Sequence, residues 1–280
     1  MDNNSKTVGL ILADAHVHIY QGFSLETLLS EAFENFKKVV SRKGLRRPWV
    51  PFLLLTETKS ENWFSVLSKS AAGNKAFSPE GIGRWSFQNT HEDCSLYGQL
   101  NEDEGFFLIA GRQIKAEGNL EVLALGSVES FEEGRPVKEL IQTIHKRGAI
   151  AVIPWGAGKW LGTRGRTIKN LFQNQEVPPF FLGDTRNRPV FWPKSSIFRQ
   201  AERKGLKTLT GSDPLPLLSH QKVPGSYGFR LTGEINSDYP FKSIKKLLLD
   251  PKISVVPYGR QEGPFRFFWD QFCLRAKAGK

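Results

Sequence analysis

The sequence predicts a single α/β domain in which strands and helices alternate along the chain. Short apolar runs of strand length recur between segments whose apolar residues follow helical spacing. With 280 residues, the chain is long enough to form one large hydrophobic core. Because no Pro-rich or Ser-rich linker interrupts it, we treat 1–280 as one domain, with a core at 8–216 and a C-terminal segment at 217–280 packed on that core.

The N-terminal part begins with two strand–helix pairs. An apolar run ends at Asp14, as expected for a strand that is buried on both faces. Ser24 is a suitable N-cap for the first amphipathic helix. Strands are predicted at 8–13 and 51–56, helices at 25–36 and 61–70, and an excursion of loops or hairpins at 72–105.

The same alternation continues to the end of the core. Strands are predicted at 106–110, 120–125, 149–153, 180–182 and 208–210, and helices at 137–146, around Leu171 and at 195–204. Alternation of this length implies parallel strands joined by right-handed crossovers. The C-terminal segment, rich in aromatic and basic residues, is expected to add a strand at 227–231 and helices at 241–249 and 265–274.

Composition excludes several classes of protein. No run approaches the roughly 20 apolar residues of a membrane helix, and the polar start of the chain does not resemble a signal peptide, so we expect a cytoplasmic protein. Cys94 and Cys273 are the only cysteines and lie far apart, which argues against a disulfide framework or a CxxC site. Any metal must therefore be held by histidines and carboxylates.

Basic residues concentrate in the second half. Residues 1–140 hold 15 basic and 19 acidic side chains, whereas 141–280 hold 24 and 9. Nucleic acid is one possible partner, because basic residues there are interleaved with Trp160, Trp192, Phe265, Phe267, Phe268 and Trp269. We favour a small anionic substrate, since the basic residues form no dense run and no nucleic-acid-binding signature is present.

The sharpest chemical feature is Asp14-Ala-His-Val-His18 at the end of the first predicted strand. In a regular strand His16 and His18 point to one face, so both imidazoles can reach one cation while Asp14 orients or joins them. Of the other histidines, His91 is expected to be structural, His145 to lie on an exposed helix face and His220 in a loop.

A second feature is Asp213, which directly follows the last predicted core strand in Gly211-Ser-Asp213. An aspartate at a strand end can ligate a metal or take a proton from a metal-activated water molecule. Ser-Asp-Pro is also common in turns, so Asp213 gains weight only together with the two histidines.

The order of these motifs resembles the PHP (polymerase and histidinol phosphatase) family. The resemblance covers about residues 8–216 and rests on Asp14-Ala-His-Val-His18, Leu55-Thr-Glu57, Gly111-Arg-Gln113, the run from Gly148 to Pro154, and Gly211-Ser-Asp213. It implies a distorted (β/α)7 barrel, similar to a TIM barrel, to which the composition adds a basic C-terminal extension. It also implies a metal-dependent phosphoesterase whose site lies at the C-terminal mouth of the barrel.

Several metal ligands of the family are replaced in this chain. The family has Asp-His, Glu, His-Pro and a closing Asp-His where this chain has Glu57-Thr58, Gln113, Ile153-Pro154 and Asp213-Pro214. What remains is His16, His18 and Asp213, completed by Glu57, Asp184 or Asp14. That set suits one divalent ion, such as zinc, manganese or iron, with an open position for water.

A glycine-rich segment from Trp155 to Arg166 follows the strand at 149–153. It does not match the phosphate-binding P-loop pattern, because Trp160 follows Lys159. It is still expected to bind an anion or, alternatively, to be a solvated basic loop. The expected substrate contacts are Lys159, Arg164, Arg166, Arg186 and Arg188.

The sequence therefore predicts a metal-dependent hydrolase, with a phosphoesterase as the first choice. Two alternatives stay open. One is a PHP-like protein that has lost catalysis and binds a ligand or a partner. The other is an amidohydrolase-like enzyme, although the bridging lysine and additional strand-end histidines of that group are not found.

Overall fold

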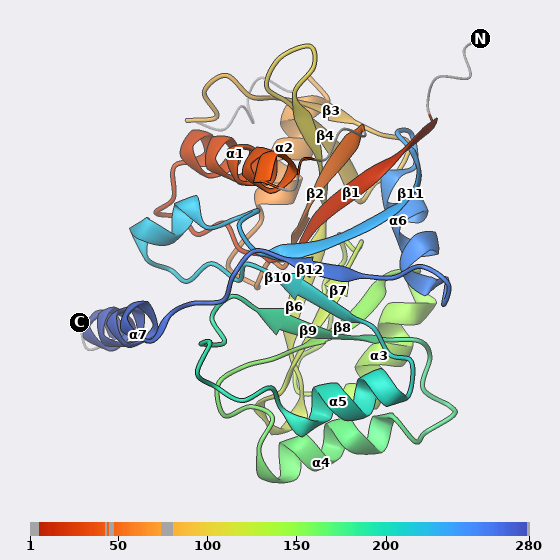
Figure 1. Ribbon diagram of the computed structural model, residues 1–280. Helices are drawn as coiled ribbons and strands as arrows, with labels where there is room; N and C mark the ends of the chain where they lie inside the picture. Colours follow the sequence, from red (N-terminus) through yellow and green to blue (C-terminus); the bar gives the residue numbers. More distant parts are fainter. Residues whose placement is uncertain (1–5, 43, 45–47, 74–80, 279–280) are drawn as a thin grey trace.

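The computed structural model, shown in Figure 1, describes residues 6–42, 44, 48–73 and 81–278. Their strands form a seven-stranded sheet, in the order β12-β11-β1-β2-β5-β4-β3, and a five-stranded sheet, in the order β10-β9-β8-β7-β6. The larger sheet contains β1 (Lys6–Val17), β2 (Trp49–Leu55), β3 (Ser86–Asn89), β4 (Ser95–Gln99), β5 (Gly105–Ile109), β11 (Gly228–Asn236) and β12 (Val256–Tyr258). The smaller sheet contains β6 (Gly111–Lys115), β7 (Glu121–Leu125), β8 (Ile150–Pro154), β9 (Phe181–Thr185) and β10 (Thr208–Gly211).

Helices cover the outer face of each sheet (Figure 1). The helices of the described residues are α1 (Leu25–Arg42), α2 (Trp63–Ala71), α3 (Val137–Lys146), α4 (Gly162–Leu171), α5 (Ser196–Arg203), α6 (Pro240–Leu249) and α7 (Pro264–Ala278), with the 3-10 turns η2 (Glu117–Asn119) and η3 (Leu218–Lys222). Helices α1 and α2 pack on the larger sheet, and α3, α4 and α5 pack on the smaller one. The result is four layers, helix–sheet–sheet–helix.

Strand alternation divides the core into three clusters of buried side chains. In β1, Leu10 and Leu12 face the helices of the larger sheet, whereas Ile11 and Ala13 point into the space between the two sheets. Facing residues of the smaller sheet, such as Val152, fill the same inner space. This alternation follows from the two-residue period of a strand and lets one apolar strand serve two cores.

The predicted α/β class is confirmed, and the strands of the described residues form two sheets without closing into one barrel. The expectation of parallel core strands is wrong for β7, which pairs antiparallel with both β6 and β8. The reason is local: β6 and β7 are joined through the short turn 116–120, which leaves no room for a crossover helix. In the tail, β11 likewise pairs antiparallel with β1.

The two sheets adjoin at two seams. At one seam, the Glu57 backbone N–H donates to Gly111 and the Gln113 N–H donates to Glu57. At the other, the Asp213 N–H donates to the His16 carbonyl at 2.8 Å. Each seam has a glycine at its closest approach, because a Cβ on Gly111 would lie 2.1 Å from the Leu55 carbonyl oxygen and one on Gly211 2.4 Å from the His16 nitrogen.

The two helices of the C-terminal segment differ in how they pack. Helix α6 inserts Phe241 and Ile244 into the inner cluster, while α7 projects away from the body (Figure 1). Within the described part of the chain, no helix combines the length and the apolar character needed to cross a membrane.

Candidate metal centre

The histidines that end β1 lie side by side in the protein interior. His16 and His18 are both buried, and their Nε2 atoms are 3.2 Å apart. The pairing of β1 with β2 shifts register between Asp14 and Val17, which marks an irregular end to the strand. The expected convergence of the two imidazoles is therefore present in the structure.

Asp213 reaches the same point from β10. Its Oδ1 atom lies 3.5 Å from Nε2 of His16 and 4.0 Å from Nε2 of His18. Its backbone has φ of 49°, in the left-handed region that aspartate tolerates better than most residues. The backbone is held on both sides, by the bond to the His16 carbonyl and by Asn187, whose amide donates to the Asp213 carbonyl at 2.6 Å.

These three residues fit a single metal ion. Their ligand atoms form a triangle with sides of 3.2, 3.5 and 4.0 Å. A point in its plane lies about 2.1 Å from each atom, which matches zinc–nitrogen and zinc–oxygen bond lengths. Asp213 is the most exposed of the three, with 23% of its side chain accessible, so the triangle opens to solvent on that side.

Further polar groups surround the histidines. Nδ1 of His18 lies 3.3 Å from a carboxylate oxygen of Glu61, and Nε2 of His16 lies 3.1 Å from the amide oxygen of Gln113. A proton donated from Nδ1 to Glu61 leaves the Nε2 lone pair of His18 free for a metal. Gln113 thus faces the metal position.

Burial and nearby charges shift the pKa values of His16 and His18 in opposite directions. Burial lowers the pKa of His16, although the Asp213 charge opposes this effect, so the neutral ring is favoured. For His18, burial also lowers the pKa, but the hydrogen bond to Glu61 and the Asp213 charge outweigh it, and the pKa is raised. A cation at the triangle would replace the proton that these carboxylates attract.

Asp14 does not point its carboxylate at the triangle. One oxygen accepts from the backbone N–H groups of Ser212 and His16, and the other accepts from Gly225, each at 2.8 to 3.2 Å. Burial raises the pKa of Asp14 to about 7, and these hydrogen bonds oppose that rise. The structure therefore gives Asp14 contacts that tie β1 to the segment carrying Asp213.

The structure gives both remaining candidate ligands other partners. Glu57 lies 3.0 Å from Arg112 and accepts from the Phe64 backbone at 2.8 Å. Asp184 makes two 2.8 Å bonds to Arg188. Neither carboxylate belongs to the converging group of His16, His18 and Asp213 among the described residues.

Four of the five candidate substrate cations have partners within the protein. Lys159 pairs with Glu121, Arg186 with Glu262 and Arg188 with Asp184, while Arg164 donates to the Gly158 carbonyl. Arg166 is exposed and, with the N-terminal ends of α4 and α5, lines a cavity of about 470 Å³. The structure thus does not gather these side chains around one anion.

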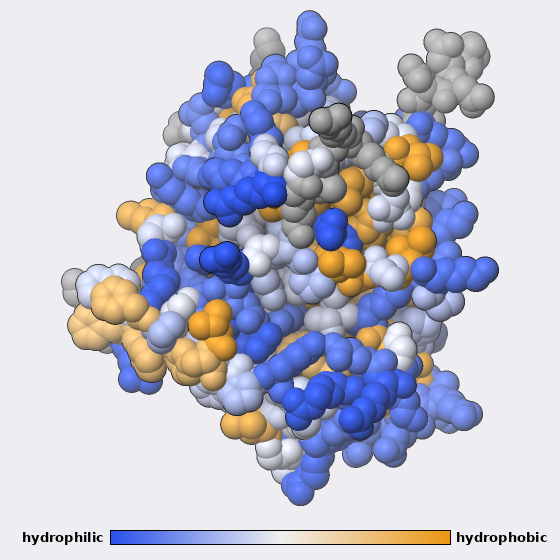
Figure 2. Space-filling view, viewed as in Figure 1, coloured by the Kyte–Doolittle hydropathy of each residue, from blue (hydrophilic) through white to orange (hydrophobic). Residues whose placement is uncertain are grey.

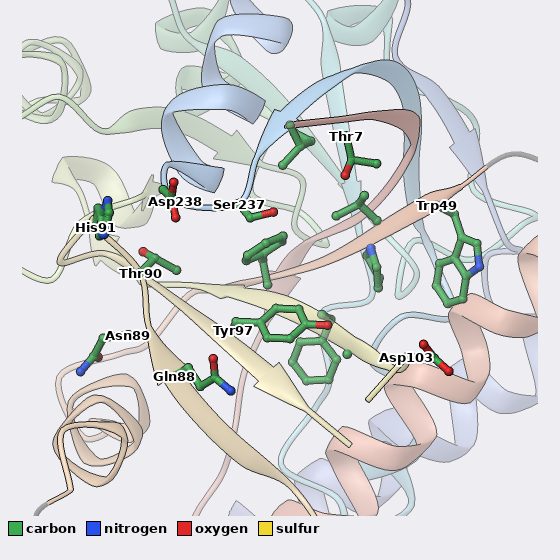
Figure 3. Close-up of a pocket in the computed structure, with 16 residues that line it drawn as sticks. Thr7, Trp49, Gln88, Asn89, Thr90, His91, Tyr97, Asp103, Ser237 and Asp238 are labelled. Carbon is green, nitrogen blue, oxygen red and sulfur yellow. The ribbon is translucent and has the colours of Figure 1, made fainter. Parts of the chain in front are cut away.

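Two cavities differ in their relation to the metal triangle. A cavity of about 280 Å³ is lined by Glu57, Glu61, Arg112 and Gln113, so it adjoins the histidines. A larger cavity of about 400 Å³, shown in Figure 3, is lined by Thr7 and other residues from the start of β1 and β2 and therefore lies at the opposite end of the strands. The smaller cavity is the one beside the metal triangle, because two of its lining residues, Glu61 and Gln113, touch His18 and His16.

A second converging group is formed by His220, Glu262 and Asp270. His220 is fully buried, and its Nε2 lies 2.9 Å from Asp270 while its Nδ1 accepts from the Leu215 backbone. Arg186 and Arg266 already neutralise the two carboxylates. This group is therefore an internal ion-pair network.

Sequence reasoning missed Glu61 as a partner of His18 and did not foresee the buried state of His220. Glu61 lies in the loop after β2, four residues beyond Glu57. Its position shortly after a strand end is the only feature of the sequence that could have identified it as a site residue. His220 has no sequence neighbour that reveals its partner, because Asp270 is 50 residues away.

Comparisons with known proteins add distant structural neighbours. No family model matches the chain, and no curated protein matches it. PsfC from Pseudomonas syringae PB-5123 aligns with a TM-score of 0.45 and 12% identity, over 85% of this chain and 96% of that protein.

Two further neighbours are lesion-directed endonucleases. The lesion-specific endonuclease PfuEndoQ from Pyrococcus furiosus aligns with a TM-score of 0.49 and 12% identity, over 89% of this chain and 59% of that one. Endonuclease Q in complex with a 27-mer duplex carrying an abasic lesion aligns with a TM-score of 0.41 and 12% identity, over 86% and 56%. The chain therefore spans less than two thirds of both endonucleases, and the functional argument rests on the site geometry.

Proposed function

We propose that the protein binds one divalent metal ion through His16, His18 and Asp213 and hydrolyses a phosphoester. The single observation that carries this proposal is the triangle of ligand atoms, which has sides of 3.2 to 4.0 Å and opens to solvent at Asp213. Three protein ligands and one open position are the usual arrangement of a catalytic zinc site.

Each residue has a role that follows from its surroundings. His16 and His18 would offer their Nε2 lone pairs to the metal, and Glu61 fixes the ring of His18 through Nδ1. Asp213, the most exposed of the three, is the ligand and is also placed to accept a proton from an attacking water molecule. When bound, the metal supplies Lewis acidity and lowers the pKa of water toward about 7.

The cavity beside the triangle is lined by the acidic residues Glu57, Glu61 and Glu133 as well as by basic ones, so its charge alone does not select an anion. Arg112 lines this cavity, as does Lys59, whose side chain is 69% exposed. The choice of a phosphoester among anionic substrates rests on the resemblance of the strand-end motifs to the PHP family. Arg112 is already paired with Glu57, so we expect it to orient a phosphoryl oxygen with part of its donor set.

The test is metal-dependent hydrolysis of bis(p-nitrophenyl) phosphate and p-nitrophenyl phosphate. Protein treated with chelator and then given zinc, manganese or magnesium is compared with a His16→Ala, His18→Ala variant and with the exposed-histidine control His145→Ala. We expect the double variant to lose at least about 100-fold in rate and the control to keep it. Equal rates for wild type and double variant would refute the assignment, and metal binding without turnover would favour a non-catalytic binding protein.

A further inference from the structure

Helix α7 carries a stripe of exposed aromatic side chains. Phe265, Phe268, Trp269 and Phe272 are 86%, 62%, 56% and 65% exposed. Their spacing of three and four residues puts them on one face of the helix. Figure 2 shows apolar surface at the end of the molecule where α7 projects. We call these four residues the α7 stripe.

Apolar residues of the body border the α7 stripe. Phe191, in the loop before α5, is 48% exposed and stacks on Phe268 with ring centroids 5.8 Å apart. Val190, next to Phe191 in the chain, is also largely exposed. A contiguous aromatic patch of this kind marks a binding surface, since soluble monomers rarely expose one.

The body of the protein anchors α7 through few contacts. Among the α7 side chains that the structure describes, Asp270 alone is buried, where it meets His220. Arg266 adds polar contacts to Asp270 and to Ser219. Isolated helices of about 15 residues are marginal in water, and most helical stability comes from burying an apolar face. The α7 stripe therefore needs a partner surface to stabilise the helix in this position.

We propose that the α7 stripe is covered by the same stripe of a second copy of this chain, in a two-fold symmetric dimer. The area is sufficient: aromatic side chains bury about 150–250 Å² each, so the five rings, at their exposed fractions, and Val190 offer roughly 600–700 Å² per copy. Stable interfaces begin at about 600 Å² per partner.

The composition of the patch favours a self-complementary protein contact. The spacing of the α7 stripe is that of helix packing, and the four residues include no charge that would need an opposite charge on the partner. Arg266, beside the stripe, is already paired with Asp270 at 3.2 Å. The net charge of +11 opposes association of two copies, but salt at physiological strength screens charges beyond about 8 Å.

The experiment compares oligomeric state by sedimentation velocity at concentrations up to about 50 µM. We expect the wild type to reach twice its 31.6 kDa mass, and a Phe268→Ser, Phe272→Ser variant to weaken the dimer by at least about 100-fold. The matched control is Val8→Ser, Leu249→Ser, which removes exposed apolar side chains outside α7 and should leave the dimer intact.

A second measurement does not depend on the stability of the altered helix. In a background with Cys94→Ser and Cys273→Ser, a cysteine introduced by Gln271→Cys should form covalent dimers with a short bismaleimide, and one introduced by Val8→Cys should not. A monomeric wild type, a dimer that persists in the Phe268→Ser, Phe272→Ser variant, or a monomer that sediments with anionic phosphatidylserine vesicles would overturn the proposal.

Discussion

Asp213 combines an unusual backbone with a candidate metal ligand. Its φ of 49° is one of two positive values at non-glycine residues among those described. Both sides of its peptide are fixed, by the His16 carbonyl and by Asn187. Left-handed backbone at a bulky or charged residue costs stability and persists mainly where surrounding contacts enforce it, often at functional sites. The strain therefore positions the carboxylate against the two histidines.

This arrangement predicts a separation of stability from metal binding in Asp213→Gly. Glycine adopts positive φ without strain, which offsets its greater freedom in the unfolded chain, so unfolding free energy should stay within about 1 kcal/mol of the metal-free wild type. Metal affinity should fall by more than about 100-fold, because one of three ligands is lost. Denaturant unfolding and metal titration check the two parts. A loss of several kcal/mol would show that the carboxylate is mainly structural.

Glu61 predicts a milder effect at the same site. It touches His18 at 3.3 Å and also accepts from the Thr58 backbone at 2.8 Å. Burial raises the pKa of Glu61, but the contacts with His18 and Thr58 outweigh burial, so the pKa is lowered and the carboxylate stays charged. Glu61→Gln should weaken metal binding by about 10–100-fold. Isothermal titration with zinc measures this, and the exposed substitution Glu129→Gln should change nothing.

The candidate site depends on a seam between two elements, β1 and β10. They belong to different sheets, and the bond from Asp213 to His16 crosses between the segments that follow them. Gly211 permits the close approach, since a Cβ there would lie 2.4 Å from the His16 nitrogen and 2.5 Å from its Cβ. The distance between the metal ligands thus follows from backbone packing two residues before Asp213.

Gly211→Ala is therefore expected to damage both fold and site. The extra methyl group has to push β10 from β1, at a cost of about 1–3 kcal/mol of unfolding free energy. The shift should also reduce metal affinity. Gly22→Ala is the matched control, because its Cβ would meet only a leucine methyl group at 4.0 Å, and it should stay within about 0.5 kcal/mol. A Gly211→Ala variant with wild-type stability and affinity would show that the seam is adaptable.

The positions of strands and helices could be predicted where apolar residues formed a continuous run or followed helical spacing. Apolar runs located β1, β2, β8 and β9, and helical spacing located α1 and α3. Whether two strands pair parallel or antiparallel was harder to predict, because the apolar pattern of a strand does not depend on which strand lies beside it. The hairpin of β6 and β7 and the antiparallel partner of β1 both depend on contacts across the chain.

The site residues that could be predicted from the sequence are those that directly follow or end a strand. His16 and His18 share a strand end, so their convergence followed from spacing, and Asp213 occupied the end of another strand. The pair of Arg112 and Glu57 joins residues 55 positions apart and has no local sequence signal, whereas Arg188 lies only four residues after Asp184. Burying a carboxylate without a cation is costly, and the fold supplies those cations from distant or looped positions.

At the scale of the whole molecule, α7 joins the body through a buried titratable network. His220 accepts a hydrogen bond at Nδ1 from Leu215 and meets Asp270 of α7 at Nε2. Burial lowers the pKa of His220 below its ordinary value of 6.5, although Asp270 opposes this. The neutral ring is thus the form that the folded state prefers.

This predicts a loss of stability on the acid side. As the pH falls below 6.5, the unfolded chain takes up a proton at His220 before the folded protein does, so unfolding becomes easier. His220→Gln keeps a donor for Asp270 and an acceptor for Leu215 without titrating. Its melting temperature should therefore fall less than that of the wild type between about pH 7.5 and pH 5.5. Parallel slopes for the two proteins would contradict this account.

Metal stoichiometry shows whether His16, His18 and Asp213 hold a metal ion. Protein purified without chelator is analysed by mass spectrometry for zinc, manganese and iron, beside the His16→Ala, His18→Ala variant and the exposed control His145→Ala. We expect about one equivalent of metal in wild type and control, and less than about a tenth of an equivalent in the double variant. Absence of metal from all three proteins after zinc is supplied, or an equal metal content in all three, would contradict this expectation.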